Sequence, residues 1–194
     1  MKIIRHRRNT LEELNETPHE YGVEVDIRSL GHDLLIQHDP FKPGERFDDW
    51  IAAYRHGILV LNVKEEGLEG RLLDLMARHG ISDFFFLDQS FPFLIKTAKT
   101  GERRCAVRVS EFESIETALS LSGKVGWVWI DYFTRYPLSR EQTDVLRQAG
   151  FKLCMVSPEL QGYGESELVA LKNLFESEGM VIDAVCTKKP ELWV

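Results

Sequence analysis

Eight short β-like runs alternate with helix-like runs along the chain, and this alternation restricts its fold more than any other feature. Residue types and periodicity predict strands at 2–4, 23–27, 59–63, 84–87, 106–109, 127–130, 152–156 and 182–186. They predict helices at 68–78, 91–98, 115–121, 140–148 and 165–177, and a glycine follows four of these five within a few residues, as is common after a helix end. Such alternation selects a parallel α/β protein, and eight units favour a closed (β/α)8 TIM barrel over an open doubly wound sheet.

The length of 194 residues sets two further expectations. It suits one domain, so we expect residues 1–194 to form a single TIM barrel. Because such barrels typically have about 250 residues, the loops must be short. The first two helical regions are weak. Between Asp26 and His38 a turn precedes a short extended run, which predicts a small β-excursion there.

Composition limits the partners and the location. The formal net charge of −7 argues against general affinity for nucleic acid or anionic membranes, and we expect a small-molecule substrate. No apolar run approaches membrane-spanning length and no apolar h-region follows the basic first residues, so we expect no membrane span and a cytoplasmic location. Cys105, Cys154 and Cys186 lie far apart in apolar runs, which is typical of reduced, buried thiols. The sequence leaves the oligomeric state open.

Two carboxylates share one face of the second predicted strand. Residues 22–27 alternate strictly, so that Glu24 and Asp26 lie on one face and apolar side chains on the other. Two neighbouring acids form a poor core and a good site for a hard metal ion. His6-Arg7 precedes this strand and His38-Asp39 follows it. Together these residues supply the imidazoles, carboxylates and guanidinium that metal-assisted chemistry on a phosphate needs.

A barrel would bring the carboxyl ends of its strands to one mouth, where the active sites of such barrels lie. A single polar residue at such an end is most simply a strand-end cap or a surface charge. Because several units aim polar groups at the same place, we expect a site there, with Arg108 as an additional anion contact. The polar residues at these ends are His6, Arg7, Glu24, Asp26, Asn62, Lys64, Asp88, Arg108, Asp131, Ser157 and Glu159.

The order of these motifs resembles that of the glycerophosphodiester phosphodiesterase family, part of the phospholipase-C-like phosphodiesterase barrels. His6-Arg7 is similar to the family's opening His-Arg, Glu24-Val25-Asp26 to its Glu-x-Asp, and His38-Asp39 to its His-Asp. The third strand departs from the family, because Asn62 and Lys64 stand where it has Glu-x-Lys. Further similar segments are Asn9-Thr10, Gln89-Ser90-Phe91 and, at the last strand, residues 181–190.

The resemblance implies a metal-dependent phosphodiester hydrolase that acts on a small diester. Glu24 and Asp26, with Asn62 or a water, would hold one divalent cation, Mg2+ or Ca2+. An amide at position 62 in place of the family's glutamate keeps one oxygen ligand but removes a charge. If Asn62 does not face the cation, the third ligand would come from Asp88, Asp131 or solvent.

The resemblance also implies the roles of the basic residues. Arg7 and Lys64 would bind the phosphate oxygens, arginine as a two-pronged donor and lysine as a point charge. His6 and His38 would act as the general acid and the general base, in either order.

Three other interpretations stay open. A degenerate barrel would bind a phosphorylated ligand without turnover, and a sugar-phosphate isomerase or aldolase-type enzyme would use Lys64 as a Schiff base. Alternatively, Glu24 and Asp26 would only form a buried ion-pair cluster with nearby arginines. The presence of both His6 and His38 favours hydrolysis, since a pure binding site needs neither an acid nor a base.

Overall fold

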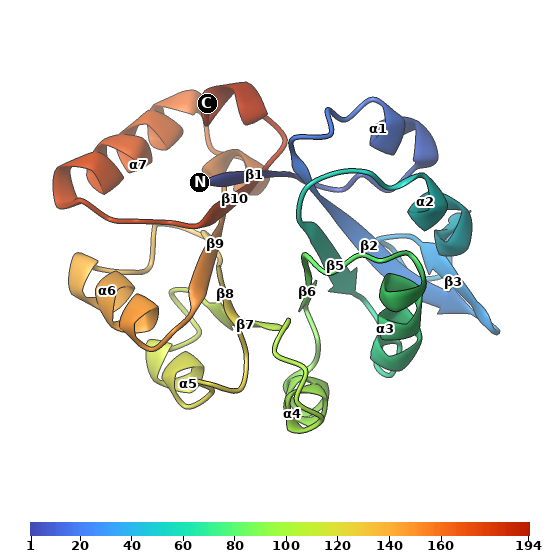
Figure 1. The fold of residues 1–194 in the computed structure, drawn as a ribbon. Helices are drawn as coiled ribbons and strands as arrows, with labels where there is room; N and C mark the ends of the chain where they lie inside the picture. The colour runs from blue at the N-terminus through green and yellow to red at the C-terminus, as the bar shows by residue number, and fades with distance from the viewer. The chain divides into compact units, whose positions relative to one another are not determined.

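The computed structural model describes all 194 residues, which form a mixed α/β fold rich in parallel strands (Figure 1). The chain divides into two compact units, one of residues Ile4–Thr100 and one of Met1–Ile3 with Gly101–Val194. Strand β1 (Lys2–Arg5) runs from one unit into the other. The predicted α/β class is therefore confirmed. Closure of all eight parallel strands into one barrel, and a single domain over residues 1–194, stay predictions.

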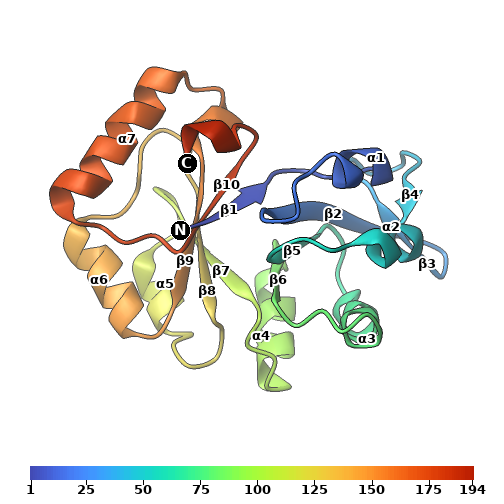
Figure 2. The same cartoon turned by 45° about the horizontal axis from the view of Figure 1, so that its top comes forward.

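The unit Ile4–Thr100 is built on parallel strands in the order β1, β2 (Gly22–Leu30), β5 (Leu59–Val63) and β6 (Phe84–Leu87). Two short antiparallel strands, β3 (Asp33–Ile36) and β4 (Glu45–Arg46), follow the second half of β2 and confirm the predicted β-excursion (Figure 2). The helices of this unit are α1 (Leu11–Asn15), α2 (Phe47–Ala53), α3 (Glu69–Arg78) and α4 (Phe91–Lys99).

The second unit repeats the same alternation. Its parallel strands pair in the order β7 (Ala106–Val109), β8 (Trp127–Ile130), β9 (Lys152–Val156) and β10 (Ala184–Thr187). Its helices are α5 (Ile115–Leu119), α6 (Arg140–Gln148) and α7 (Glu165–Glu178), with 3-10 turns at Pro158–Gln161 and Pro190–Leu192. Figure 1 shows these helices along the outside of the strands.

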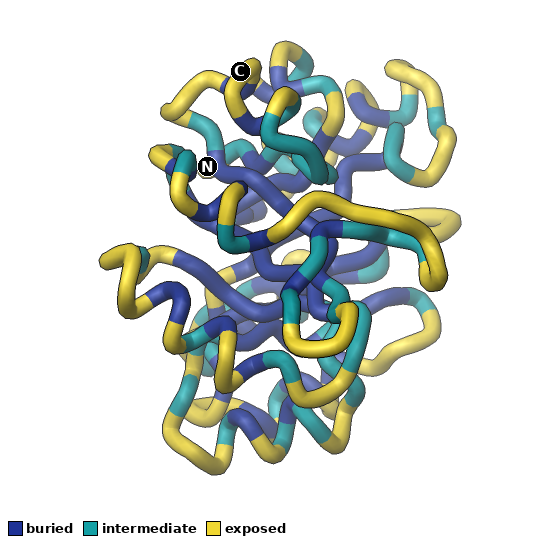
Figure 3. The backbone as a smooth tube through the Cα atoms, turned by 90° about the vertical axis from the view of Figure 1, so that its right-hand side faces the viewer, coloured by how far each residue is buried: buried dark blue, intermediate teal, exposed yellow.

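The strands form the buried part of each unit. All residues of β5 and β6 are buried. Figure 3 shows long buried stretches of the backbone alternating with exposed loops and turns. Strands that are covered on both faces have continuous apolar sequences. The run Phe84-Phe85-Phe86 has this character and therefore indicates a strand. The predicted last strand, 182–186, is observed as β10 at Ala184–Thr187, and the Asp183 carboxylate just before it accepts the N–H of Leu153 and binds Arg147.

The helix ends and the cysteines agree with the sequence. The glycines after four helices, Gly80, Gly101, Gly150 and Gly179, have φ of 66, 90, 89 and 63°, the left-handed conformation of a helix stop. Cys105, Cys154 and Cys186 are buried and form no disulfide, as predicted. No helix combines the length and the apolar character that a membrane span requires.

Candidate functional site

Six of the eight predicted site residues lie close together in the unit Ile4–Thr100, on or directly after three neighbouring strands. His6 and Arg7 follow β1, and Lys64 follows β5. In β2 the apolar side chains of Val23, Val25 and Ile27 are fully buried on one face, which leaves the opposite face to Glu24 and Asp26. The β2–β5 register places Asp26 beside Asn62. His38 lies in the same unit but outside this cluster, and Arg108 belongs to the other unit.

Glu24 is the centre of this cluster. Its Oε2 accepts the backbone N–H of Arg7 at 2.8 Å, and its Oε1 accepts the Asn62 Nδ2–H at 2.7 Å. His6 Nε2 lies 3.9 Å from the same Oε2. The carboxyl is 1% exposed, and burial, followed by the charge of Asp26, raises its pKa to about 7, while the bonds from Asn62 and Arg7 act in the opposite direction.

Asp26 is fully buried and lies between two cations. Its Oδ1 is 3.4 Å from Lys64 Nζ, and its Oδ2 is 3.6 Å from Arg7 Nε. The amide of Asn9 holds it from both sides, since Nδ2 donates to Oδ2 at 2.7 Å and Oδ1 accepts the Asp26 N–H at 3.0 Å. Sequence reasoning noticed Asn9 as part of a motif but not this contact, because 17 residues separate the two.

The loop after β1 is tightly held. Arg8 donates its N–H to the Glu24 carbonyl at 2.9 Å, and its own carbonyl accepts the indole N–H of Trp50 at 2.9 Å. Thr10 then caps α1 in a capping box with Glu13. Arg7 has a positive φ of 52°, which turns its backbone N–H toward Glu24. Non-glycine residues in this conformation gather at functional sites, where the surroundings enforce the strain.

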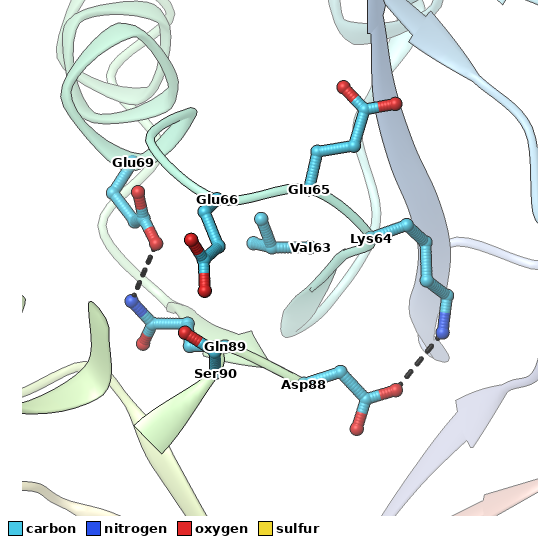
Figure 4. Close-up of a pocket in the computed structure, with 8 residues that line it drawn as sticks. All are labelled: Val63, Lys64, Glu65, Glu66, Glu69, Asp88, Gln89 and Ser90. Carbon is cyan, nitrogen blue, oxygen red and sulfur yellow. Dashed lines mark hydrogen bonds and ion pairs between the residues drawn. The ribbon is translucent and has the colours of Figure 1, made fainter. Parts of the chain in front are cut away.

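Lys64 is the second basic residue of the cluster. Its ammonium lies 3.0 Å from Oδ2 of Asp88, the residue after β6 (Figure 4). It also lies 3.4 Å from Asp26 Oδ1. The predicted polar residue Asp88 thus reaches the cluster through Lys64.

His38 lies on the loop after β3, beside the strand that carries the acids but outside their contacts. The backbone N–H of Gln37 donates to the Asp26 carbonyl at 3.0 Å, so the loop starts next to the site. The His38 imidazole binds Asp39 Oδ1 through Nδ1 at 2.8 Å, and no contact joins it to Glu24 or Asp26. Hydrogen bonds from Lys42 and then from His38 lower the pKa of Asp39 to about 2.

Arg108 belongs to the other unit, on β7. Its guanidinium pairs with Asp131, and its Nε lies 3.7 Å from Glu113 Oε1. The predicted anion contact is therefore engaged by acids of its own unit.

The donor atoms of the cluster are of the types that bind a hard cation, although they are not arranged as a complete set of metal ligands. No group of three or more His, Cys, Asp or Glu side chains is arranged to hold a metal ion. Oxygen donors are nevertheless present, because the buried Oδ1 atoms of Asp26 and Asn62 accept no hydrogen bond. With Glu24 they make two carboxylates and one amide, the ligand types of Mg2+ and Ca2+.

Glu24 should give the metal-free protein a recognisable pH dependence. The pKa of Glu24 in the folded state, about 7, lies above the ordinary 4.5, so the folded state holds the proton more tightly than the unfolded state. The protonated Glu24 therefore stabilises the fold below pH 4.5, and this stabilisation is lost as the pH rises through 7. In Glu24→Gln this titration is absent. We expect the difference in unfolding free energy, wild type minus variant, to fall by on the order of 3 kcal/mol from about pH 4 to about pH 8. Denaturant titrations with a chelator measure it; a difference independent of pH would contradict the assignment.

Comparison with solved structures finds the same fold in two enzymes of the family that the motifs resemble. A glycerophosphodiester phosphodiesterase from Agrobacterium tumefaciens has a TM-score of 0.67 at 15% identity, covering 99% of this chain and 98% of that one. A glycerophosphoryl diester phosphodiesterase from Parabacteroides distasonis has a TM-score of 0.67 at 14% identity, covering 98% and 84%. A mutant tryptophan synthase α-subunit from Pyrococcus furiosus is also similar, with a TM-score of 0.55 at 14% identity, covering 96% and 86%.

At these identities the likeness establishes the fold. The predicted resemblance to the glycerophosphodiester phosphodiesterases is confirmed at that level. No family model matches the sequence, and a search of the curated proteins finds no match.

Proposed function

We propose that the chain is a metal-dependent phosphodiester hydrolase, resembling the glycerophosphodiester phosphodiesterases and acting on a small diester in the mouth of a closed (β/α)8 barrel. The observation that carries the proposal is the contact cluster of Glu24, Asp26 and Asn62 with His6, Arg7 and Lys64. A fold shared with two such enzymes supports it, because His6, Arg7, Asn62 and Lys64 lie at or just after the carboxyl ends of parallel strands, where this fold has its active sites.

Glu24, Asp26 and Asn62 would hold one divalent cation, Mg2+ or Ca2+. When bound, such a cation polarises a phosphoryl oxygen as a Lewis acid. Two carboxylates are buried side by side at this place, and the pKa of Glu24 is raised by that burial and by the charge of Asp26. A bound cation would offset the negative charge of the two groups. The Asn62 amide donates through Nδ2 to Glu24. Rotation of the amide by half a turn would instead direct its oxygen to this side, where it would be available to a cation beside Glu24.

The basic residues would bind and orient the phosphate. Arg7 and Lys64 lie on either side of Asp26, at 3.6 and 3.4 Å from its two oxygens, so a phosphate beside Asp26 would be within reach of both. Lys64 is engaged by two carboxylates, whereas a Schiff base needs a lysine nitrogen that is free to attack a carbonyl. This favours phosphate binding over the aldolase-type alternative.

His6 and His38 would move the protons. His6 Nε2 is close enough to Glu24 to be held over the cluster, and it would exchange a proton with the attacking or the leaving oxygen. His38 would serve the opposite oxygen through Nε2, because its Nδ1 is bonded to Asp39, which fixes the ring. Arg108 would contribute an additional anion contact.

A panel of soluble phosphodiesters and the matching monoesters tests the proposed reaction. With a divalent cation, we expect cleavage of one or more diesters while the monoesters stay intact. Hydrolysis of monoesters alone would contradict the proposal. Binding of phosphate without turnover of any diester would favour the second candidate, a binding protein, which the replacement of a carboxylate by Asn62 supports.

Asn62→Glu should strengthen cation binding. The variant adds a carboxylate beside Glu24 and Asp26, and ligand charge tunes the affinity of oxygen sites for Mg2+ and Ca2+. We expect a higher affinity in calorimetric titrations, with retained or increased diesterase activity. An unchanged affinity would mean that residue 62 does not face the cation, and that its amide contacts the substrate instead.

A further inference from the structure

Asp88 holds the ammonium group of Lys64 in a defined place. Lys64 Nζ is 3.0 Å from Asp88 Oδ2 and 3.4 Å from Asp26 Oδ1, and the lysine side chain is only 15% exposed. An ammonium group has three N–H donors. One N–H donates to Asp88, and Asp26 Oδ1 lies within ion-pair distance without accepting a hydrogen bond, so N–H donors are left for a ligand.

The backbone of Asp88 is in an unusual conformation. Its φ of 59° lies in the left-handed region, where aspartate and asparagine are tolerated better than most residues but still carry strain. Asp88 follows β6 directly, and this conformation is the one in which its carboxylate meets Lys64. Such strain persists only where the surroundings enforce it, and it points to a functional requirement.

A pocket beside Lys64 shows why the lysine needs a restraint. It has a volume of about 290 Å³, with Lys64 and Asp88 on one side and the Gln89–Glu69 hydrogen bond of 2.9 Å on the other (Figure 4). An unrestrained lysine chain has room to swing into this space. Without Asp88, the lysine could also approach and cover Asp26 Oδ1, the other carboxylate within ion-pair distance.

We propose that Asp88 is a positioning residue, which keeps the Lys64 ammonium between two carboxylates so that a remaining N–H is directed at a phosphate oxygen. The proposal rests on the proposed function in that this oxygen belongs to the substrate phosphate. Asp88 acts through its ion pair with Lys64. Its effect is to prevent Lys64 from swinging into the pocket or closing onto Asp26.

Asp88→Asn in the full chain, with inorganic phosphate as the probe, tests this role. Asparagine accepts the left-handed backbone, so we expect an unchanged melting temperature. We expect phosphate binding to weaken roughly tenfold in calorimetric titrations, as for the loss of one charge-assisted donor, and the KM for a diester to rise similarly while kcat changes less. Asp88→Gly, which removes the carboxylate and relieves the backbone strain, should lose phosphate affinity without loss of stability.

Glu66→Gln is the matched control. Glu66 is exposed, lines the same pocket and does not contact Lys64, so this variant removes one negative charge and nothing else. Removing a negative charge near an anion strengthens anion binding by itself, so the loss expected for Asp88→Asn has the opposite sign to the pure charge effect.

Two results would overturn the positioning role: no phosphate binding by the wild type, or equal phosphate binding by wild type and Asp88→Asn. If phosphate binding weakens in Asp88→Asn but the wild type cleaves no diester, the positioning role holds and the proposed hydrolysis is wrong.

Discussion

Replacing His6 by alanine should reduce diester turnover by about 10²- to 10⁴-fold, the range that a general acid or base contributes. His6 follows β1 and lies with its Nε2 at 3.9 Å from Glu24 Oε2, at the edge of the carboxylate cluster. Its loss removes a proton carrier but no ligand of the cation, so we expect metal and phosphate affinities to stay near those of the wild type. Steady-state kinetics and calorimetry on the same preparation measure both.

His38→Ala and His32→Ala complete this comparison. His38 is the second proposed proton carrier, and we expect a loss of similar size. His32 is exposed in the turn between β2 and β3 and has no role in the account, so His32→Ala should behave as wild type. Near-normal activity in either His6→Ala or His38→Ala would contradict the acid and base assignment, and a loss in His32→Ala would point to a general effect on folding.

Asp26→Asn should destabilise the protein by about 3–5 kcal/mol, the cost of breaking a buried ion pair by removing one partner. Asp26 is fully buried and lies within ion-pair distance of Arg7 and Lys64, so the variant leaves both cations without their shared partner. The loss of a carboxylate should also lower the affinity for Mg2+ or Ca2+. Denaturant titration and calorimetry measure the two effects separately.

Asp33→Asn provides a matched control for burial. The Asp33–Arg46 pair has the same 3.4 Å separation as the Lys64–Asp26 pair, but its aspartate is 48% exposed. Exposed pairs contribute little, so we expect almost no change in stability. Equal effects of Asp26→Asn and Asp33→Asn, or a cation affinity unchanged in Asp26→Asn, would show that Asp26 is neither a buried charge centre nor a ligand.

The strands and longer helices could be predicted from the sequence because their signals are local. Runs such as 59–63 and 84–87 are continuously apolar, and their observed bounds agree with the prediction. The two short helices were not assigned, although each has a local signal. Thr10 and Glu13 form the capping box of α1, and the apolar residues Phe47, Trp50 and Ile51 of α2 have helical spacing.

The neighbours of Glu24 and Asp26 could be predicted only in part. Strand alternation puts the two carboxylates on one face, and the β2–β5 register brings Asn62 beside them, as barrel geometry requires. The Asn9 clamp on Asp26 and the left-handed backbones of Arg7 and Asp88 were not predictable, because they depend on contacts between segments distant in sequence. His38 and Arg108 matched a motif and a strand end, but the structure pairs them with Asp39 and Asp131, and their roles stay predictions.

Phosphorus NMR of diester hydrolysis with controlled divalent cation tests the central claim most directly. The purified full chain is treated with a chelator, mixed with the panel of diesters, and then supplied with Mg2+, Ca2+ or Mn2+ in turn. We expect the diester resonance to persist in the chelated sample and, once a cation is added, to be replaced by a monoester or cyclic phosphate resonance. Hydrolysis at the same rate in the chelated sample, or no hydrolysis of any diester with any of the cations, would contradict the central claim.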